Sequence, residues 1–183
     1  YSYMRCIPNM LIMAPADENE CRQMLTTGFQ HPGPASVRYP RGKGPGVAVD
    51  PALTALEIGK GEIRHHGGRI AILAWGSMVT PSVEAGKQLG ATVVNMRFVK
   101  PFDEALVLEL AKTHDVFVTV EENVLAGGAG SAINAFLQAQ KVLMPVCNIG
   151  LPDRFVEQGS REELLSLVGL DSKGILATIE QFC

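Results

Sequence analysis

The sequence has no apolar run long enough to cross a bilayer, no basic block and few aromatic residues. Its 183 residues include 16 Lys and Arg against 19 Asp and Glu, a formal net charge of −3, and 46% are hydrophobic. A membrane-spanning helix needs roughly 20 apolar residues, and proteins that bind nucleic acid or anionic membranes display clustered positive charge. These absences leave small-molecule chemistry and protein contacts as the expected functions.

Cysteines are few and scattered, at positions 6, 21, 147 and 183. None has the C-x-x-C or C-x-x-H spacing of a zinc site, and nothing in the pattern indicates a disulfide framework. The composition therefore favours a reduced, cytoplasmic protein. The N-terminus, Tyr1-Ser2-Tyr3, has neither an initiator Met nor a basic leader, so we expect the chain to begin inside a longer protein.

The first part of the chain predicts one β-α-β unit. An apolar run at 10–13 precedes Asp17-x-x-Glu20, which resembles the start of a capped helix, and this helix is expected to end near Gly28. A strand follows from Ala35. Residues 42–55 are rich in Gly and Pro and lack periodicity, which indicates a linker. One such unit is too small to fold alone.

Beyond the linker, strands and helices alternate regularly. Short runs of β-branched residues predict buried strands of a mostly parallel sheet, with helices covering both faces. The fold class is therefore a three-layer α/β domain preceded by a partial β-α-β piece. The expected strands are 69–75, 92–98, 116–121 and 146–149 with an edge strand near 57–64, and the expected helices are 78–89, 103–113, 130–140, one capped by Ser160-x-x-Glu163, and 172–182.

Candidate site residues follow the strands, because parallel sheets bind ligands beyond the carboxyl ends of their strands. Arg41 is the strongest, since Pro40 ends the strand and a guanidinium there can offer two donors to a phosphate or carboxylate. Arg41 could instead form a surface ion pair or reach another domain, and Arg38 could pair with an acidic neighbour. The other candidates are Gly76-Ser77, Arg97, Glu121-Glu122-Asn123, and Gly150 with Asp153.

Two glycine-containing turns have both a functional and a structural interpretation. The turn Gly127–Ser131 could hold an anion at a helix start, but it lacks the third glycine of a dinucleotide motif, and close packing explains its glycines at least as well. Gly76-Ser77 is more simply a tight turn with an N-cap for the next helix.

Several strings together resemble the 1-deoxy-D-xylulose-5-phosphate synthases, thiamine-diphosphate enzymes of the transketolase superfamily. They are YSYMRCIPNMLIMAPADENECRQML, VRYPRG, VVNMRFVKPFDEAL, VTVEENVLAGGAGSAIN and NIGLPDRFVEQG, and they cover nearly the whole chain. The resemblance implies an enzyme that joins pyruvate, after decarboxylation, to glyceraldehyde 3-phosphate. The product is a precursor of isoprenoids, thiamine and pyridoxal.

The resemblance also implies specific roles and omissions. The second arginine of RYPRG binds the phosphate of the aldehyde in this family, and here it is Arg41, while Arg38 keeps a structural role. Thiamine diphosphate and magnesium need a Gly-Asp-Gly, which is absent, and the catalytic residues would lie upstream. No catalytic, cofactor-binding or metal-binding residue is therefore expected in this chain. Residues 1–45 would end the pyrimidine-binding domain, 46–55 would be a linker, and 56–183 would form the C-terminal domain.

Two other hypotheses remain open from the sequence. The chain could be a free-standing module that binds a phosphate or nucleotide at the Gly127–Ser131 turn, or a purely dimer-forming module. The synthase interpretation predicts a homodimer for the full-length enzyme and no activity for these 183 residues alone. It also predicts apolar surface that makes the isolated chain self-associate or lose order over its first 40 residues.

Overall fold

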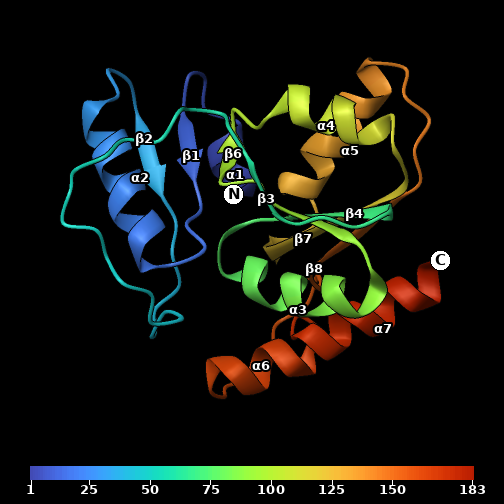
Figure 1. Cartoon of the computed structure of the whole chain (residues 1–183). Helices are drawn as coiled ribbons and strands as arrows, with labels where there is room; N and C mark the ends of the chain where they lie inside the picture. The colour runs from blue at the N-terminus through green and yellow to red at the C-terminus, as the bar shows by residue number, and fades with distance from the viewer.

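The computed structural model describes every residue from Tyr1 to Cys183 and contains two sheets (Figure 1). The larger has five strands in the order β3-β5-β4-β7-β8. Four of them run parallel, and β3 pairs antiparallel with β5 at the edge. The strands are β3 (Glu62–His65), β4 (Arg69–Ala74), β5 (Thr92–Asn95), β7 (His114–Val124) and β8 (Val146–Leu151).

Helices cover both faces of this sheet, as predicted. On β4, Ala71 and Leu73 belong to one core and Ile72 and Ala74 to another, because successive strand side chains point to opposite faces. The first core is closed by α4 (Glu104–Ala111) and α5 (Ala129–Ala139), and the second by α3 (Val79–Leu89) and α7 (Ser172–Phe182). The three-layer α/β prediction is confirmed.

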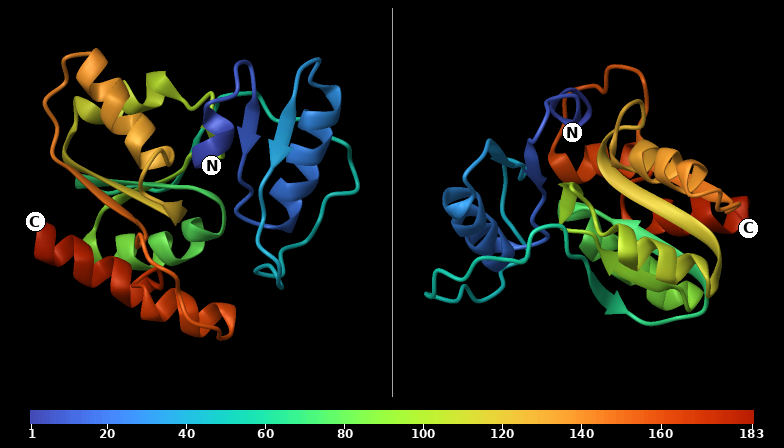
Figure 2. Two further views of the ribbon diagram at one scale, coloured as in Figure 1. Left: turned by 180° about the vertical axis from the view of Figure 1, so that it is seen from behind. Right: turned by 90° about the horizontal axis from the view of Figure 1, so that it is seen from above.

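A smaller sheet lies beside this domain in a separate lobe (Figure 2). Its order is β2-β1-β6, where β1 is Leu11–Met13, β2 is Ala35–Val37 and β6 is Phe98–Lys100. The helix α2 (Glu18–Gln30) packs on it through Met24, which joins Leu11, Met13 and Phe98 in a small buried cluster. Two short helices, α1 (Ser2–Arg5) and α6 (Arg161–Leu167), complete the chain with a 3-10 turn at Gly76–Met78. The sequence did not predict α1.

The strand predicted at 92–98 is wrong in its extent, and the correction explains how the lobes join. β5 ends at Asn95, Arg97 adopts a left-handed φ of 59°, and the chain then forms β6 in the other sheet. There β6 pairs antiparallel with β1. Residues 92–98 contain no proline or glycine that would end a strand, so the sequence gives no sign of the turn at Arg97. A strand from the second part of the chain thus completes the first sheet.

Residues 38–61 contain no helix or strand and run along α2 (Figure 1). Side chains of α2 hold the backbone of this segment at intervals. Glu18 accepts from Gly46 N at 2.8 Å, and Thr27 Oγ1 accepts from Leu56 N at 2.8 Å. The part of the segment from Gly46 to Leu56 is therefore fastened to α2.

The sequence predicts capped starts for two helices, and the structure shows one of these caps in full and the other in part. Ser160 and Glu163 form a complete capping box at α6. Asp17 accepts from Glu20 N at 2.8 Å, but the Glu20 carboxylate bonds Ala16 N and not the cap residue. No helix combines the length and the hydrophobicity that a membrane span requires.

Candidate functional site

Arg41 lies just beyond the carboxyl end of β2, exposed and without a hydrogen bond or ion pair to the rest of the chain. It lines a cavity of about 550 Å³ between the two lobes. The other charged residues of this cavity are Arg38, Glu122 and Arg161, and its apolar wall includes Leu151 and Leu164. The alternative of an ion pair within the chain is not seen, and the Arg41 guanidinium has no partner in the chain.

Arg38 has the structural role expected of it. Its Nη2 donates to the Glu122 carbonyl at 3.0 Å, and its Nη1 lies 3.7 Å from Glu122 Oε2. Its guanidinium also stacks over the Tyr1 ring, 5.6 Å from the centroid. Arg38 thus ties the segment after β2 to β7 of the larger lobe, and this contact places Arg41 at the cavity.

Glu122 is the acceptor around which the cavity is organised. Its Oε2 receives Arg161 Nη2 at 2.5 Å and Ser77 Oγ at 2.5 Å. Burial by itself raises the pKa of Glu122, but the hydrogen bonds from Arg161 and Ser77 and the charge of Arg38 outweigh burial, so the pKa lies below its ordinary value. Glu122 is therefore a carboxylate at neutral pH.

Ser77 does not cap a helix, contrary to the prediction. Met78 is the N-cap of α3 and makes no side-chain cap, while the Ser77 hydroxyl turns to Glu122. The tight turn itself is present, since Gly76 has a φ of 61° and a Cβ there would lie 3.3 Å from the Ala14 Cβ. The Ser77 hydroxyl thus donates to a carboxylate and does not accept from an amide at the start of α3.

The Gly127–Ser131 turn is already occupied by a carboxyl group of the chain. Glu121, fully buried, accepts from Ala129 N and Gly130 N at 2.8 Å each. Burial raises the pKa of Glu121, although these two amides favour its ionised form. The amides that could have held a nucleotide phosphate are thus satisfied within the fold.

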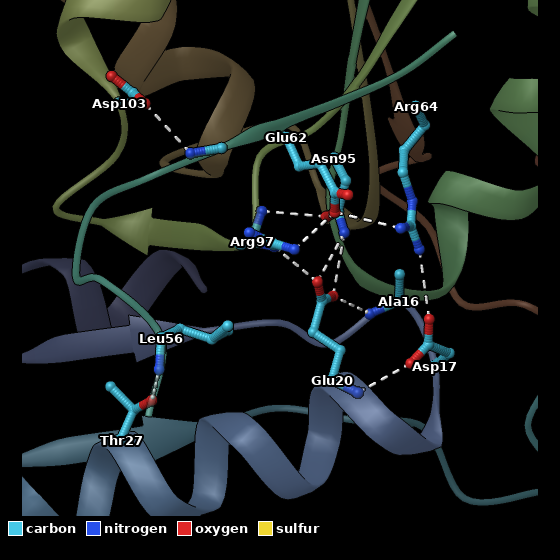
Figure 3. Close-up of polar contacts among 11 residues, drawn as sticks. Ala16, Asp17, Glu20, Thr27, Leu56, Glu62, Arg64, Asn95, Arg97 and Asp103 are labelled. Carbon is cyan, nitrogen blue, oxygen red and sulfur yellow. Dashed lines mark hydrogen bonds and ion pairs between the residues drawn. The ribbon is translucent and has the colours of Figure 1, made fainter. Parts of the chain in front are cut away.

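The remaining candidates serve the structure. Arg97 belongs to an interlobe cluster with Glu20 and Glu62 (Figure 3). Asn123 Nδ2 donates to Ser2 Oγ at 3.0 Å, next to α1. Gly150 lies within β8, where a Cβ would come 2.7 Å from the Asn123 carbonyl oxygen. Asp153 is exposed and has no polar partner within the chain.

The sequence reasoning missed Arg161. Arg161 does not follow a strand, because it begins α6 directly after the Ser160 cap. The capping pattern identified the helix but carried no information on what its first residue would face.

The residues present do not fit a bound thiamine diphosphate and its magnesium. No three His, Cys, Asp or Glu side chains lie together in a way that could hold a metal ion. Glu121 is bonded by backbone amides at the start of α5, and Glu122 is bonded by the guanidinium of Arg161.

Comparison with known proteins gives two family matches. Residues 59–175 match the transketolase C-terminal domain, and residues 1–46 match the transketolase pyrimidine binding domain. Among curated proteins, the chain is 63% identical over 181 residues to a 1-deoxy-D-xylulose-5-phosphate synthase of Methylococcus capsulatus and 59% identical over 181 residues to one of Photobacterium profundum. These alignments cover 99% of this chain but 28% and 29% of the relatives, so the chain spans under a third of their length.

Solved structures agree with the sequence matches. A split gene transketolase, described as an inactive β4 tetramer, superposes with a TM-score of 0.87 at 31% identity and covers 98% of this chain and 59% of its own. A transketolase from Campylobacter jejuni superposes with a TM-score of 0.69 at 18% identity. The superposition covers 98% of this chain and 27% of the transketolase chain, which shows a shared fold.

Proposed function

Because this chain belongs to the transketolase C-terminal domain family and is homologous to the C-terminal portion of 1-deoxy-D-xylulose-5-phosphate synthases, we propose that it is the C-terminal part of such an enzyme. The full-length protein would be cytoplasmic and would condense pyruvate, with loss of carbon dioxide, with glyceraldehyde 3-phosphate. Thiamine diphosphate and magnesium would be bound by residues outside this chain. The proposed domain division remains 1–45, 46–55 and 56–183.

The chain's own contribution is a binding site for the phosphate of the aldehyde. The observation that carries this proposal is Arg41, an unpaired guanidinium at a cavity of about 550 Å³ between the lobes. A guanidinium offers parallel donors that match the geometry of a phosphate. Binding there would hold the aldehyde by its far end and leave its carbonyl carbon to the catalytic residues.

Replacing Arg41 in the full-length enzyme tests this role. In Arg41→Ala we expect the KM for glyceraldehyde 3-phosphate to rise about tenfold or more, the loss of one charge-assisted interaction, while the KM for pyruvate changes little. Arg154→Ala is the matched control, because Arg154 is also exposed and lies outside this cavity. Equal losses for both substrates in Arg41→Ala would contradict the assignment.

We further propose that the full-length enzyme is a homodimer and that these 183 residues alone are inactive. The related split gene transketolase forms a tetramer, which supports an oligomeric enzyme. Large exposed side chains, such as Phe29 at 92% and Tyr3 at 78% exposure, are available to be buried at such a contact. Sedimentation of the full-length protein tests the dimer, and detectable product from this chain alone would overturn the second statement.

The alternative of a free-standing nucleotide-binding module has no support in the geometry. Its candidate amides, Ala129 N and Gly130 N, are bonded to Glu121. Calorimetry of the chain with ATP separates the two functions, because only a nucleotide-binding module is expected to give a saturable heat of binding.

A further inference from the structure

The two large cavities of the chain differ in the sign of their charge. The smaller one, of about 550 Å³, is lined by three arginines and one carboxylate: Arg38, Arg41, Arg161 and Glu122. The larger, of about 1080 Å³, is lined by three cations and five carboxylates: Arg22, Lys43, Arg161, Asp17, Glu18, Glu84, Glu162 and Asp171. In a chain whose net charge is −3, only the smaller cavity concentrates positive charge and suits a phosphate dianion.

The chain engages these three arginines to different extents. Arg38 is held by the carbonyl and the carboxylate of Glu122, whereas Arg41 has no partner. Arg161 donates only through Nη2, to Glu122, and its Nε is buried without an acceptor. A guanidinium has five N–H donors, so the remaining donors of Arg161 lack an acceptor from the chain. Buried donors without an acceptor are rare in folded proteins.

We propose that Arg161 is a second phosphate-binding residue, which acts with Arg41 on the phosphate of the acceptor aldehyde. This inference rests on the proposed function and deepens it. Arg41 comes from the smaller lobe and Arg161 from α6 of the larger lobe, so the phosphate is held between the two lobes. Two guanidinium groups match a dianion better than one.

Glu122 is the positioning residue of this site. Its carboxylate accepts from Arg161 Nη2 and from Ser77 Oγ, and it forms an ion pair with Arg38 Nη1. Fixing the guanidinium before the ligand arrives lowers the entropy lost on binding. The apolar side chains of Leu151, Leu164 and Val168 reduce the water around the site, which strengthens charged hydrogen bonds.

The test is the ability of the full-length enzyme to distinguish a phosphorylated from an unphosphorylated acceptor. In Arg161→Gln we expect kcat/KM for glyceraldehyde 3-phosphate to fall about tenfold, with kcat/KM for D-glyceraldehyde unchanged. Inorganic phosphate, as a competitive inhibitor against the aldehyde, should bind more weakly by a similar factor. Arg161→Lys should recover part of the loss, and Arg154→Gln, an exposed arginine outside the cavity, should change neither ratio.

The outcomes separate this inference from the proposed function. A selective loss in both Arg41→Ala and Arg161→Gln supports both. Equal loss for both aldehydes in Arg161→Gln indicates a purely structural arginine and overturns the inference. A selective loss in Arg41→Ala with a normal Arg161→Gln overturns the inference alone, and normal discrimination in both variants overturns the proposed function as well.

Discussion

Arg97 Nε lies 2.7 Å from Glu20 Oε1, and this ion pair joins α2 of the smaller lobe to the turn between β5 and β6 (Figure 3). Glu20 is 3% exposed and also accepts from Ala16 N at 2.7 Å and from Asn95 Nδ2 at 2.9 Å. Nη2 of the same Arg97 guanidinium donates to the carboxylate of Glu62 on β3. The same turn that sends β6 into the smaller sheet is thus fastened by charge.

Removing Glu20 should therefore destabilise the chain strongly. Glu20→Ala leaves the Ala16 amide without its acceptor and the partly buried Arg97 with Glu62 as its only carboxylate partner, and we expect the free energy of unfolding to fall by about 2–4 kcal/mol. Urea denaturation measures it. Glu180→Gln is the control, because that carboxylate is exposed on α7 and bonds nothing. A loss in Glu20→Ala no larger than the control's would show that the cluster adds no stability.

Glu122 should make stability depend on pH. A carboxyl whose pKa is lowered by folding contributes fully above its unfolded value, about 4.3, and loses this contribution as the pH falls through its folded value. We expect Glu122→Gln to destabilise the chain by about 1–2 kcal/mol at pH 7, since its guanidinium partners are partly exposed. The difference from the unmodified chain should shrink below about pH 4.3 in thermal denaturation. A difference that stays constant to pH 3 would argue against an ionic role.

Gly86 should not tolerate a methyl group, although it lies inside a helix. Alanine gains about 1 kcal/mol in helix propensity over glycine. A Cβ at Gly86, however, would overlap with Val93 Cγ2, because α3 lies directly against β5. Overpacking costs about 1–3 kcal/mol, so we expect Gly86→Ala to be net destabilising in chemical denaturation. Lys87→Ala, exposed on the same helix, should have little effect, and a stabilised Gly86→Ala would mean that the helix can move away.

The hydroxyl of Thr27 should slow proteolysis of the segment at residues 42–56, which crosses α2. Its hydroxyl accepts from Leu56 N, whereas the hydroxyl of Thr26 bonds only Arg22 O within the helix. Thr27→Val removes the acceptor at nearly constant shape, and a loss of about 1 kcal/mol should speed limited proteolysis between residues 42 and 56 about fivefold. Thr26→Val is the matched control. Equal cleavage rates in the two variants would show that the bond does not hold the segment.

Local patterns were sufficient for most of the fold. Runs such as RIAILA and VFVTVE alternate between two cores, so they predict strands covered on both faces. Asp17 and Ser160 mark their helices because capping depends on residues three positions apart. Arg41 could be singled out because proline ends a strand locally, but its role as a phosphate ligand stays a prediction.

Contacts between distant residues were decided only by the tertiary structure. Glu121 and Glu122 are neighbours on one strand, so their side chains must diverge, yet the sequence does not say that one meets the amides of α5 and the other meets Ser77 and Arg161. Asn95 and Phe98 fall within one strand expected from the sequence, but Arg97 turns the chain into a different sheet. Arg161 joins Arg41 at one cavity across 120 residues, and such pairings depend on how the lobes pack, which no local period encodes.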